Sequence, residues 1–174
     1  SHSFEVRMQG FGELRSLVHR RPTPQAWKQL CERLETYEPP LLQQALLPYV
    51  LSHLDATWPV GLRILPESWW PKLVLNPEQP MFQVVRRVLR YDCTYAELDA
   101  LLQAPDLQRI RRLELRLRPM GHDIARILTQ APGWPDLEHL ELSALGLDDQ
   151  GIARLAGSPI LQNLHSLREL DLTD

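Results

Sequence analysis

The sequence lacks most features that identify a secreted miniature domain or a membrane protein. It has only two cysteines, Cys31 and Cys93, and their spacing matches no redox or zinc motif. This excludes a disulfide framework and favours a reducing compartment, so we expect a cytoplasmic protein. The longest apolar run, Ala45 to Leu51, is interrupted by Pro48 and falls far short of the roughly 20 residues that a membrane helix needs. We therefore expect no membrane insertion.

Motifs for catalysis and cofactor binding are also missing. Gly10-Phe11-Gly12 lacks the third glycine of a dinucleotide-binding loop, and the sequence contains no P-loop, nucleophile elbow or zinc-protease motif. The six histidines stand without ligand spacing. We interpret Cys93 as a structural residue and Asp148-Asp149 as part of a solvated turn. The sequence thus predicts no catalytic residue, no metal site, no cofactor and no enzymatic activity.

The charge balance disfavours a nucleic-acid partner. There are 19 basic and 22 acidic residues, which gives a net charge of −3, whereas binding to phosphate backbones usually requires a basic excess. Eight arginines are nevertheless clustered between residues 86 and 118, and this stretch contains no lysine. Nucleic-acid binding through this cluster therefore stays open as a weaker alternative.

The second half of the chain contains an internal repeat of the form L-x-x-L-x-L. It occurs at residues 85–90, 110–115, 137–142 and 167–172, with Arg90 as the one departure from the pattern. The starts are 25, 27 and 30 residues apart. Each of the first three copies precedes an apolar pattern with helical spacing, at residues 98–102, 124–128 and 152–156. We predict units of a strand and a helix that stack so that their strands form a parallel sheet.

These residues carry a resemblance. Residues 85–174 resemble a leucine-rich repeat array of the long, ribonuclease-inhibitor-like kind, seen best over residues 137–156. Trp58-Pro59, Arg63, Pro66 and Trp69, with Ala-Pro or Ser-Pro at the helix ends, are similar to bacterial leucine-rich-repeat proteins of large paralogous sets. The resemblance implies a right-handed α/β solenoid with its parallel sheet on the concave face and short helices outside. It also implies a protein-interaction scaffold without catalytic residues.

The predicted organisation has three parts. Residues 8–57 form a helical cap, residues 58–84 a connector rich in proline and tryptophan, and residues 85–174 about three and a half repeats. Because the chain stops inside a repeat, we expect that further repeats follow, or that a partner covers the end.

The cap should consist of three short helices. One covers residues 11–20, one begins at Pro24 with Thr23 as its N-cap, and one begins at Pro40 and is kinked or split at Pro48. In the connector, Trp58, Trp69 and Trp70 are interpreted as packing between the cap and the first repeat. An aromatic pocket for a partner is the alternative.

The predicted partner-binding surface follows from the two-residue period of a strand. If the leucines of L-x-x-L-x-L point into the core, the intervening residues line the concave face. They are Arg87, Leu89, Tyr91, Arg112, Glu114, Arg116, His139, Glu141, Ser143, Glu169 and Asp171. We expect this face, basic at one side and acidic at the other, to bind a protein or peptide of opposite charge order. A regulatory or recognition role within a larger protein is the alternative.

Overall fold

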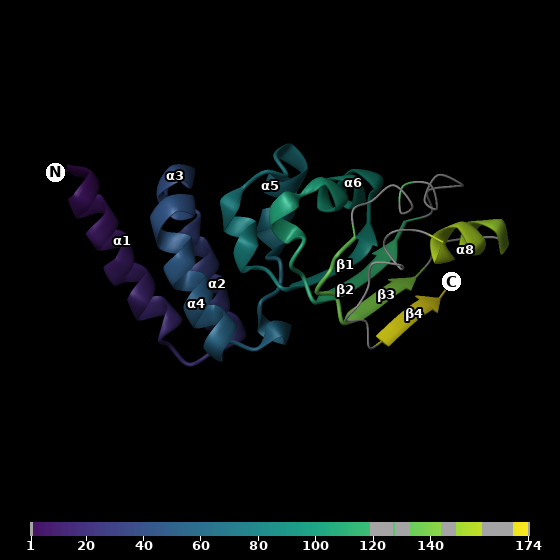
Figure 1. Cartoon of the computed structure of the whole chain (residues 1–174), viewed down its shortest axis with the longest axis horizontal. Coiled ribbons are helices and arrows are strands. Elements are labelled where there is room, and N and C mark those ends of the chain that lie inside the picture. Colours follow the sequence, from purple (N-terminus) through teal and green to yellow (C-terminus); the bar gives the residue numbers. More distant parts are fainter. Residues whose placement is uncertain (1, 119–126, 128–132, 144–148, 158–168, 174) are drawn as a thin grey trace.

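The computed structural model describes residues 2–118, 127, 133–143, 149–157 and 169–173. Within these residues, a layer of helices from the first part of the chain lies beside a small parallel sheet from the second part (Figure 1). A continuous set of buried apolar side chains joins the two, from Leu14 in the first helix to Leu142 in the third strand. The predicted domain boundaries at residues 57/58 and 84/85 stay a prediction.

The first helices follow the apolar spacing and cap residues of the sequence. They are α1 (His2–Val18), α2 (Pro24–Leu34), α3 (Pro39–Leu41) and α4 (Leu47–Thr57). The start of α2 is confirmed, because the Thr23 hydroxyl accepts a hydrogen bond from the Ala26 amide at 3.0 Å. By contrast, α1 begins nine residues before the predicted helix start at Phe11.

The predicted break at Pro48 is confirmed, and it takes the form of a π-helical segment. Residues Leu42–Leu46 form this segment between α3 and α4, and Pro48 stands in the first turn of α4. Proline has no amide hydrogen to donate and its ring crowds the preceding turn, so the helix widens before it. Leu42, Leu46 and Leu47 remain buried through the change.

The connector consists of short elements. It contains the 3-10 segments Val60–Leu62, Glu67–Trp69 and Pro80–Val84, and the helix α5 (Trp70–Leu75). It joins the sheet directly, because Ile64 forms a parallel bridge with Arg87 at the start of the first strand. The connector therefore fixes where the sheet begins relative to the helices.

In the described part of the chain, four strands form one parallel sheet in the order β1-β2-β3-β4. They are β1 (Arg87–Cys93), β2 (Arg112–Leu117), β3 (His139–Ser143) and β4 (Glu169–Thr173). Each begins two residues after the start of a repeated pattern, and for β1, β2 and β3 the first apolar residue of the pattern is buried just ahead of the strand. Val85, Ile110 and Leu137 all have no exposed surface.

Helices cover one face of the sheet. They include α5, α6 (Tyr95–Gln103), followed by the 3-10 segment Pro105–Leu107, and α8 (Asp149–Ala156) (Figure 1). The start of α6 has a capping box between Thr94 and Glu97. The helix predicted over residues 124–128 lies, apart from Ile127, outside the described residues. Among the helices described, none has the length and apolar character to cross a membrane.

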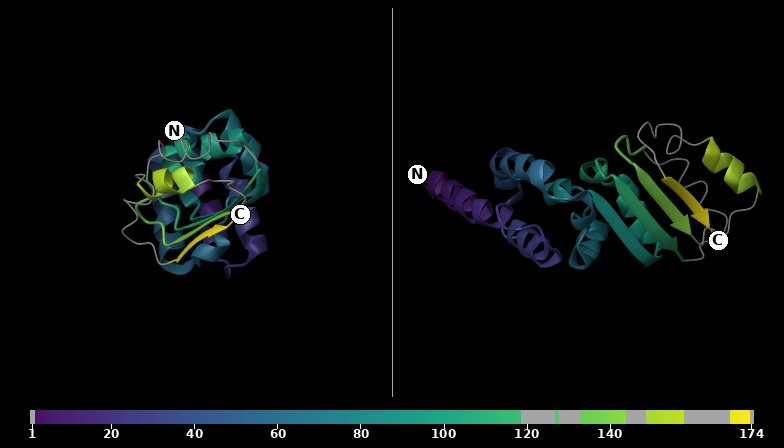
Figure 2. Two further views of the ribbon diagram at one scale, coloured as in Figure 1. Left: turned by 90° about the vertical axis from the view of Figure 1, so that its right-hand side faces the viewer. Right: turned by 90° about the horizontal axis from the view of Figure 1, so that it is seen from below.

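The predicted leucine-rich-repeat solenoid is wrong. The described residues form a small α/β domain, whose short parallel sheet is open and neither closes nor curls (Figures 1 and 2). The pattern behind the prediction has a simpler cause. Parallel neighbours are joined through crossover segments, and each strand buries alternate residues under the helices. Strands with alternating apolar residues, joined by helical segments, thus predict a parallel sheet, but they do not specify a long curved solenoid.

Replacement of a core leucine should measure how strongly the helical layer depends on packing. Leu54 of α4 has no exposed surface, whereas Leu75 at the end of α5 is 87% exposed. We expect Leu54→Ala to lower the free energy of unfolding by about 2–5 kcal/mol because it leaves a cavity. Leu75→Ala removes the same atoms from solvent-exposed surface and serves as the control. Urea unfolding followed by circular dichroism should separate them, and equal effects would contradict this packing.

Both thiols should be inert in the folded protein. Burial raises the pKa of Cys31 well above its usual range and that of Cys93 to about 12, so both are protonated at pH 8 and are poor nucleophiles. We expect a disulfide reagent such as DTNB to modify neither thiol at pH 8 until denaturant unfolds the chain, after which two thiols react. A Cys31→Ala variant assigns the contribution of each, and rapid reaction of the native protein would refute the prediction.

Candidate functional site

The strand register places the predicted partner-binding residues in rows across the sheet. One row consists of Arg87, Arg112, His139 and Glu169, and the next consists of Leu89, Glu114, Glu141 and Asp171. A third pairs Arg116 with Ser143. We call the surface formed by these residues and Tyr91 the open face. For Glu169 and Asp171, the structure describes the backbone pairing alone.

No described helix covers the open face. Figure 2, in its right-hand view from below, shows the strands in front of the helices. The burial of the side chains agrees, since Val88, Leu113 and Leu140 are at most 1% exposed, while Arg87 and His139 beside them are partly accessible. All-parallel sheets are normally covered on both faces. The open face therefore departs from the usual arrangement, and its polar side chains account for its contact with water.

Glu114 is the centre of the charges on the open face. Its side chain is 10% exposed and its carboxylate accepts two hydrogen bonds from Arg87, at 2.8 Å from Nε and 3.3 Å from Nη2. Arg112 donates a third, from Nη2 at 3.2 Å. Two guanidinium groups from neighbouring strands thus surround one carboxylate. This accounts for the burial of Glu114 in a face that is otherwise partly exposed, because charge-assisted hydrogen bonds offset the loss of hydration.

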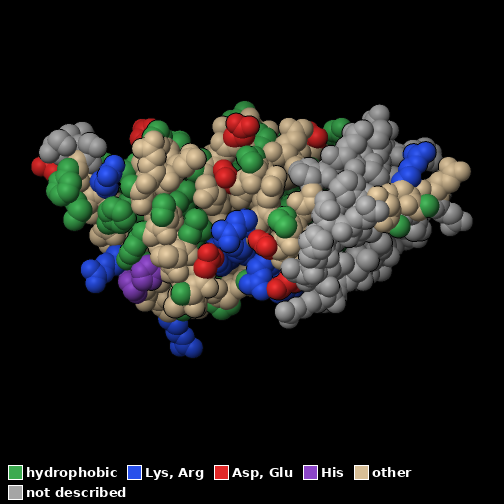
Figure 3. Space-filling model, viewed as in Figure 1, with side chains coloured by type: hydrophobic (Ala, Val, Ile, Leu, Met, Phe, Trp, Pro, Cys, Tyr) green, Lys and Arg blue, Asp and Glu red, His purple; other side chains and the backbone are tan. Residues whose placement is uncertain are grey.

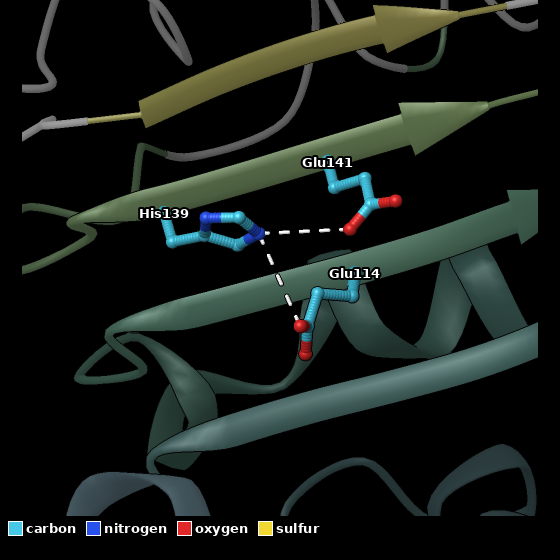
Figure 4. Close-up of side chains that lie close together, drawn as sticks. All are labelled: Glu114, His139 and Glu141. Atoms are coloured by element: carbon cyan, nitrogen blue, oxygen red, sulfur yellow. Dashed lines mark ion pairs between the residues drawn. The ribbon is translucent and has the colours of Figure 1, made fainter.

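His139 lies between two carboxylates. Its Nε2 is 3.9 Å from Oε1 of Glu114 and 3.6 Å from Oε2 of Glu141 (Figure 4). The three side chains come from two adjacent strands, and a ligand atom of each lies within 4.8 Å of the others. Imidazole and carboxylate groups in this arrangement are of the types that ligate a divalent cation.

The surroundings of Glu114 weigh against the metal interpretation. A divalent ion on this carboxylate would stand beside the guanidinium groups of Arg87 and Arg112, which already neutralise it. Like charges at such short range repel strongly where water is partly excluded. The arrangement suits a charge network that orients side chains on the sheet, and the sequence-based expectation of no metal site stays a prediction.

A bulge at Asp92 changes the edge of the open face that β1 forms. Asp92 has a φ of 58°, in the left-handed region that aspartate tolerates better than most residues. The register between β1 and β2 shifts between Arg90 and Cys93, so Tyr91 has no direct partner on β2. Arg118, just after β2, donates to both carboxylate oxygens of Asp92, at 2.7 and 2.8 Å.

The bulge leaves Tyr91 prominent. Its side chain is 69% exposed, yet it still borders a shallow depression of about 80 Å3 on the open face. Leu89, Arg116 and Glu141 line the same depression. The structure therefore brings an aromatic, an aliphatic, a cationic and an anionic side chain together at one place.

The three tryptophans that were predicted to pack the cap against the first repeat, with an aromatic pocket as the alternative, are buried. Trp58 is 4% exposed and its indole N–H donates to the Val18 carbonyl at 3.0 Å. Trp69 has no exposed surface, and its N–H donates to Glu35. Trp70 is 2% exposed, with the Arg90 guanidinium 5.1 Å from its ring centroid. These rings pack the helices, the connector and β1 together.

The sequence did not predict a second charged cluster, which lies where the strands begin. We call this end of the sheet its amino edge. The cluster includes Arg63 and Asp55 from the helical half and Arg86 and Arg111 from just ahead of β1 and β2. Arg86 and Arg111 occupy the second position of L-x-x-L-x-L, immediately before the residues of the open face. The repeated arginine at this position could have indicated a second charged surface. Nothing in the sequence, however, indicated that Arg63 and Asp55 lie beside these arginines.

Comparison with known proteins gives no assignment: no protein-family model matches the chain, and neither a curated protein nor a solved structure matches it. The geometry of the described residues is therefore the basis on which a function is proposed.

The charge network makes Glu114 more important for stability than Glu141. Glu114→Gln removes the charge that two guanidinium groups share, and we expect a loss of about 1–3 kcal/mol in the free energy of unfolding. Glu141 is 44% exposed, and Glu141→Gln should cost less than about 1 kcal/mol. Chemical denaturation of both variants at low salt measures the difference. A larger loss for Glu141→Gln would show that Glu114 is not the centre of the network.

Proposed function

We propose that the chain is a non-enzymatic protein-interaction module that binds a protein or peptide through the open face of its sheet. The observation that carries this proposal is a parallel sheet with one face free of described helices. A face of this kind offers rows of side chains on a rigid backbone, and the partner would supply the cover that helices usually give.

The composition of the open face supports this use. Tyrosine and arginine are enriched in the few interface residues that contribute most binding energy, and Tyr91 and Arg116 are both exposed beside the depression. Leu89 adds partly accessible apolar surface. By contrast, Arg87 and Arg112 are engaged by Glu114. We therefore place the energetic centre of binding at Tyr91 and Arg116.

This arrangement favours a partner segment of defined chemistry. A carboxylate facing Arg116 would form a charge-assisted hydrogen bond, and an apolar side chain between Leu89 and Tyr91 would fill the depression. Arg87, Arg112 and Glu114, which neutralise one another, would then contribute shape more than charge. The partner we propose is a protein or peptide that presents an acidic residue close to an apolar one.

The cysteines support a reducing environment for this interaction. Cys31 and Cys93 are both free and buried in the described structure, as expected for structural thiols that never pair. We propose that the protein acts in the cytoplasm. The same burial supports a non-enzymatic role, because neither thiol offers an accessible nucleophile.

A capture experiment with matched variants tests the proposal. The face variant combines Tyr91→Ala with Arg116→Glu, and the control variant combines Tyr95→Ala with Arg154→Glu. Tyr95 is 51% exposed on α6 and Arg154 is exposed on α8, so the control makes the same chemical changes on the helical side. We expect one protein from an extract of the native cells to bind the wild type and the control, and binding to the face variant to fall at least about tenfold.

The outcome should then be confirmed at the interface. A photo-crosslinking amino acid at position 91 should link to the captured protein, whereas the same residue at position 95 should not. Circular dichroism must show that both double variants fold. Equal retention by the two variants, or crosslinking from position 95 alone, would refute the open face as the binding site.

A further inference from the structure

The amino edge of the sheet holds a second row of charged residues, distinct from the open face. A backbone ladder fixes this row: the Arg86 amide donates to the Arg63 carbonyl at 2.9 Å, and the Arg111 amide donates to the Arg86 carbonyl at 2.7 Å. The Glu138 amide continues the ladder to the Arg111 carbonyl at 2.8 Å. These residues stand just ahead of the strands, and the cleft that they line shares no residue with the depression on the open face.

The side chains of this row border a cleft of about 430 Å3, which we call the arginine cleft. It contains four guanidinium groups, from Arg63, Arg86, Arg109 and Arg111. Figure 3 shows basic and acidic side chains gathered in the middle of this view, where the helical half meets the sheet. The volume is within the range of small-molecule sites in proteins.

The floor of the arginine cleft has more positive than negative charge. Arg63 and Arg86 are 2% and 4% exposed, and both pair with the same carboxylate oxygen of Asp55, at 2.6 and 3.5 Å. Backbone carbonyls accept further hydrogen bonds from both guanidinium groups, including Val84 from Arg63 and Val85 from Arg86. Two buried cations thus share one anion.

One donor on this floor is unused. The Nη2 atom of Arg63 is buried and has no hydrogen-bond partner among the described residues, although Nε and Nη1 of the same group are both bonded. A buried guanidinium donor without an acceptor is costly. Arg63 lines the arginine cleft, so an anion bound there would place negative charge beside a buried guanidinium group and offset part of the cost of its burial.

The rim of the cleft is balanced in charge. Arg109 lies 3.8 Å from Asp136, and Arg111 lies 2.5 Å from Glu138. All four rim side chains are partly exposed, so these pairs are screened by water and easily exchanged. The rim arginines are therefore able to turn toward an incoming anion, while the floor keeps its surplus charge.

The surroundings of Arg86 disfavour its charged form. Burial, and secondarily the charge of Arg63, lower the pKa of Arg86 to about 10. The group is still protonated at neutral pH, but its cationic form is disfavoured relative to a solvated arginine. A bound anion would reverse that effect and stabilise the cation.

We propose that the arginine cleft binds a small phosphate-bearing anion. A phosphoryl group offers several acceptor oxygens in different directions, which suits guanidinium groups that converge from floor and rim, whereas chloride offers a single centre. An extended nucleic-acid strand needs a groove that follows several nucleotides, and this cleft is bounded by Trp58 and Val60 on its helical side. The ligand is therefore inorganic phosphate or a phosphorylated small molecule.

Isothermal titration and thermal unfolding with inorganic phosphate and AMP, at constant ionic strength in chloride, test the proposal. We expect saturable binding that Arg111→Gln weakens about tenfold, the loss of one charge-assisted interaction. Arg118→Gln is the matched control, because Arg118 is an exposed, carboxylate-paired arginine at the other end of β2, and binding should be unchanged. Equal affinity for the two probes assigns the phosphoryl group as the ligand, and tighter AMP binding assigns a phosphorylated small molecule.

A second variant separates binding from structure without altering an arginine. Asp55→Asn removes the anion shared by Arg63 and Arg86, so we expect a lower unfolding temperature in chloride and a larger increase on adding phosphate than in the wild type. A purely structural cluster would show the first effect without the second. No phosphate-specific stabilisation, equal losses in Arg111→Gln and Arg118→Gln, or binding of a single-stranded oligonucleotide but neither small probe would each overturn the proposal.

Discussion

The in-register backbone ladder at the start of the sheet is the constraint on which the rest of the structure depends. It begins in the connector, where the Arg63 carbonyl accepts from both Arg86 and Arg87, and it is repeated from Arg86 to Arg111 and Arg112. Each parallel strand therefore begins level with its neighbour. The tryptophans of the connector pack the first step of this ladder against the helices, so the helical half and the sheet are joined where the ladder begins.

The ladder produces two charged surfaces with different chemistry. On the open face, two guanidinium groups share the carboxylate of Glu114, and the exposed binding groups stand beside this network. At the amino edge, two deeply buried guanidinium groups share Asp55, which leaves one donor of Arg63 unsatisfied. On the open face the buried charges are paired with one another, which suits the binding of a protein or peptide. In the arginine cleft the buried positive charges exceed the negative ones, which suits the binding of a small anion.

Local features of this fold follow from the sequence, whereas long-range ones do not. Thr94 and Glu97 form a capping box because they stand three residues apart, and the α-helical pattern is interrupted just before Pro48, whose ring crowds the preceding turn. At the bulge, Asp92 pairs with Arg118, which lies just after the next strand and 26 residues along the chain. The pairing of Arg63 with Asp55 depends on how the connector packs. The solenoid prediction was wrong because apolar alternation specifies burial of one face and carries no information on curvature or length.

The alternation of side chains also determines which residues fix the register of the strands. Arg86-Arg87 and Arg111-Arg112 each put one arginine in the arginine cleft and one on the open face. A slip of one residue would exchange an arginine for an arginine, so these charges barely distinguish the correct register from its neighbour. The apolar residues Val88 and Leu113 do, since the same slip would turn them out of the core. The apolar residues of these strands thus determine the register of the sheet, whereas the neighbouring arginines provide its charged binding surfaces.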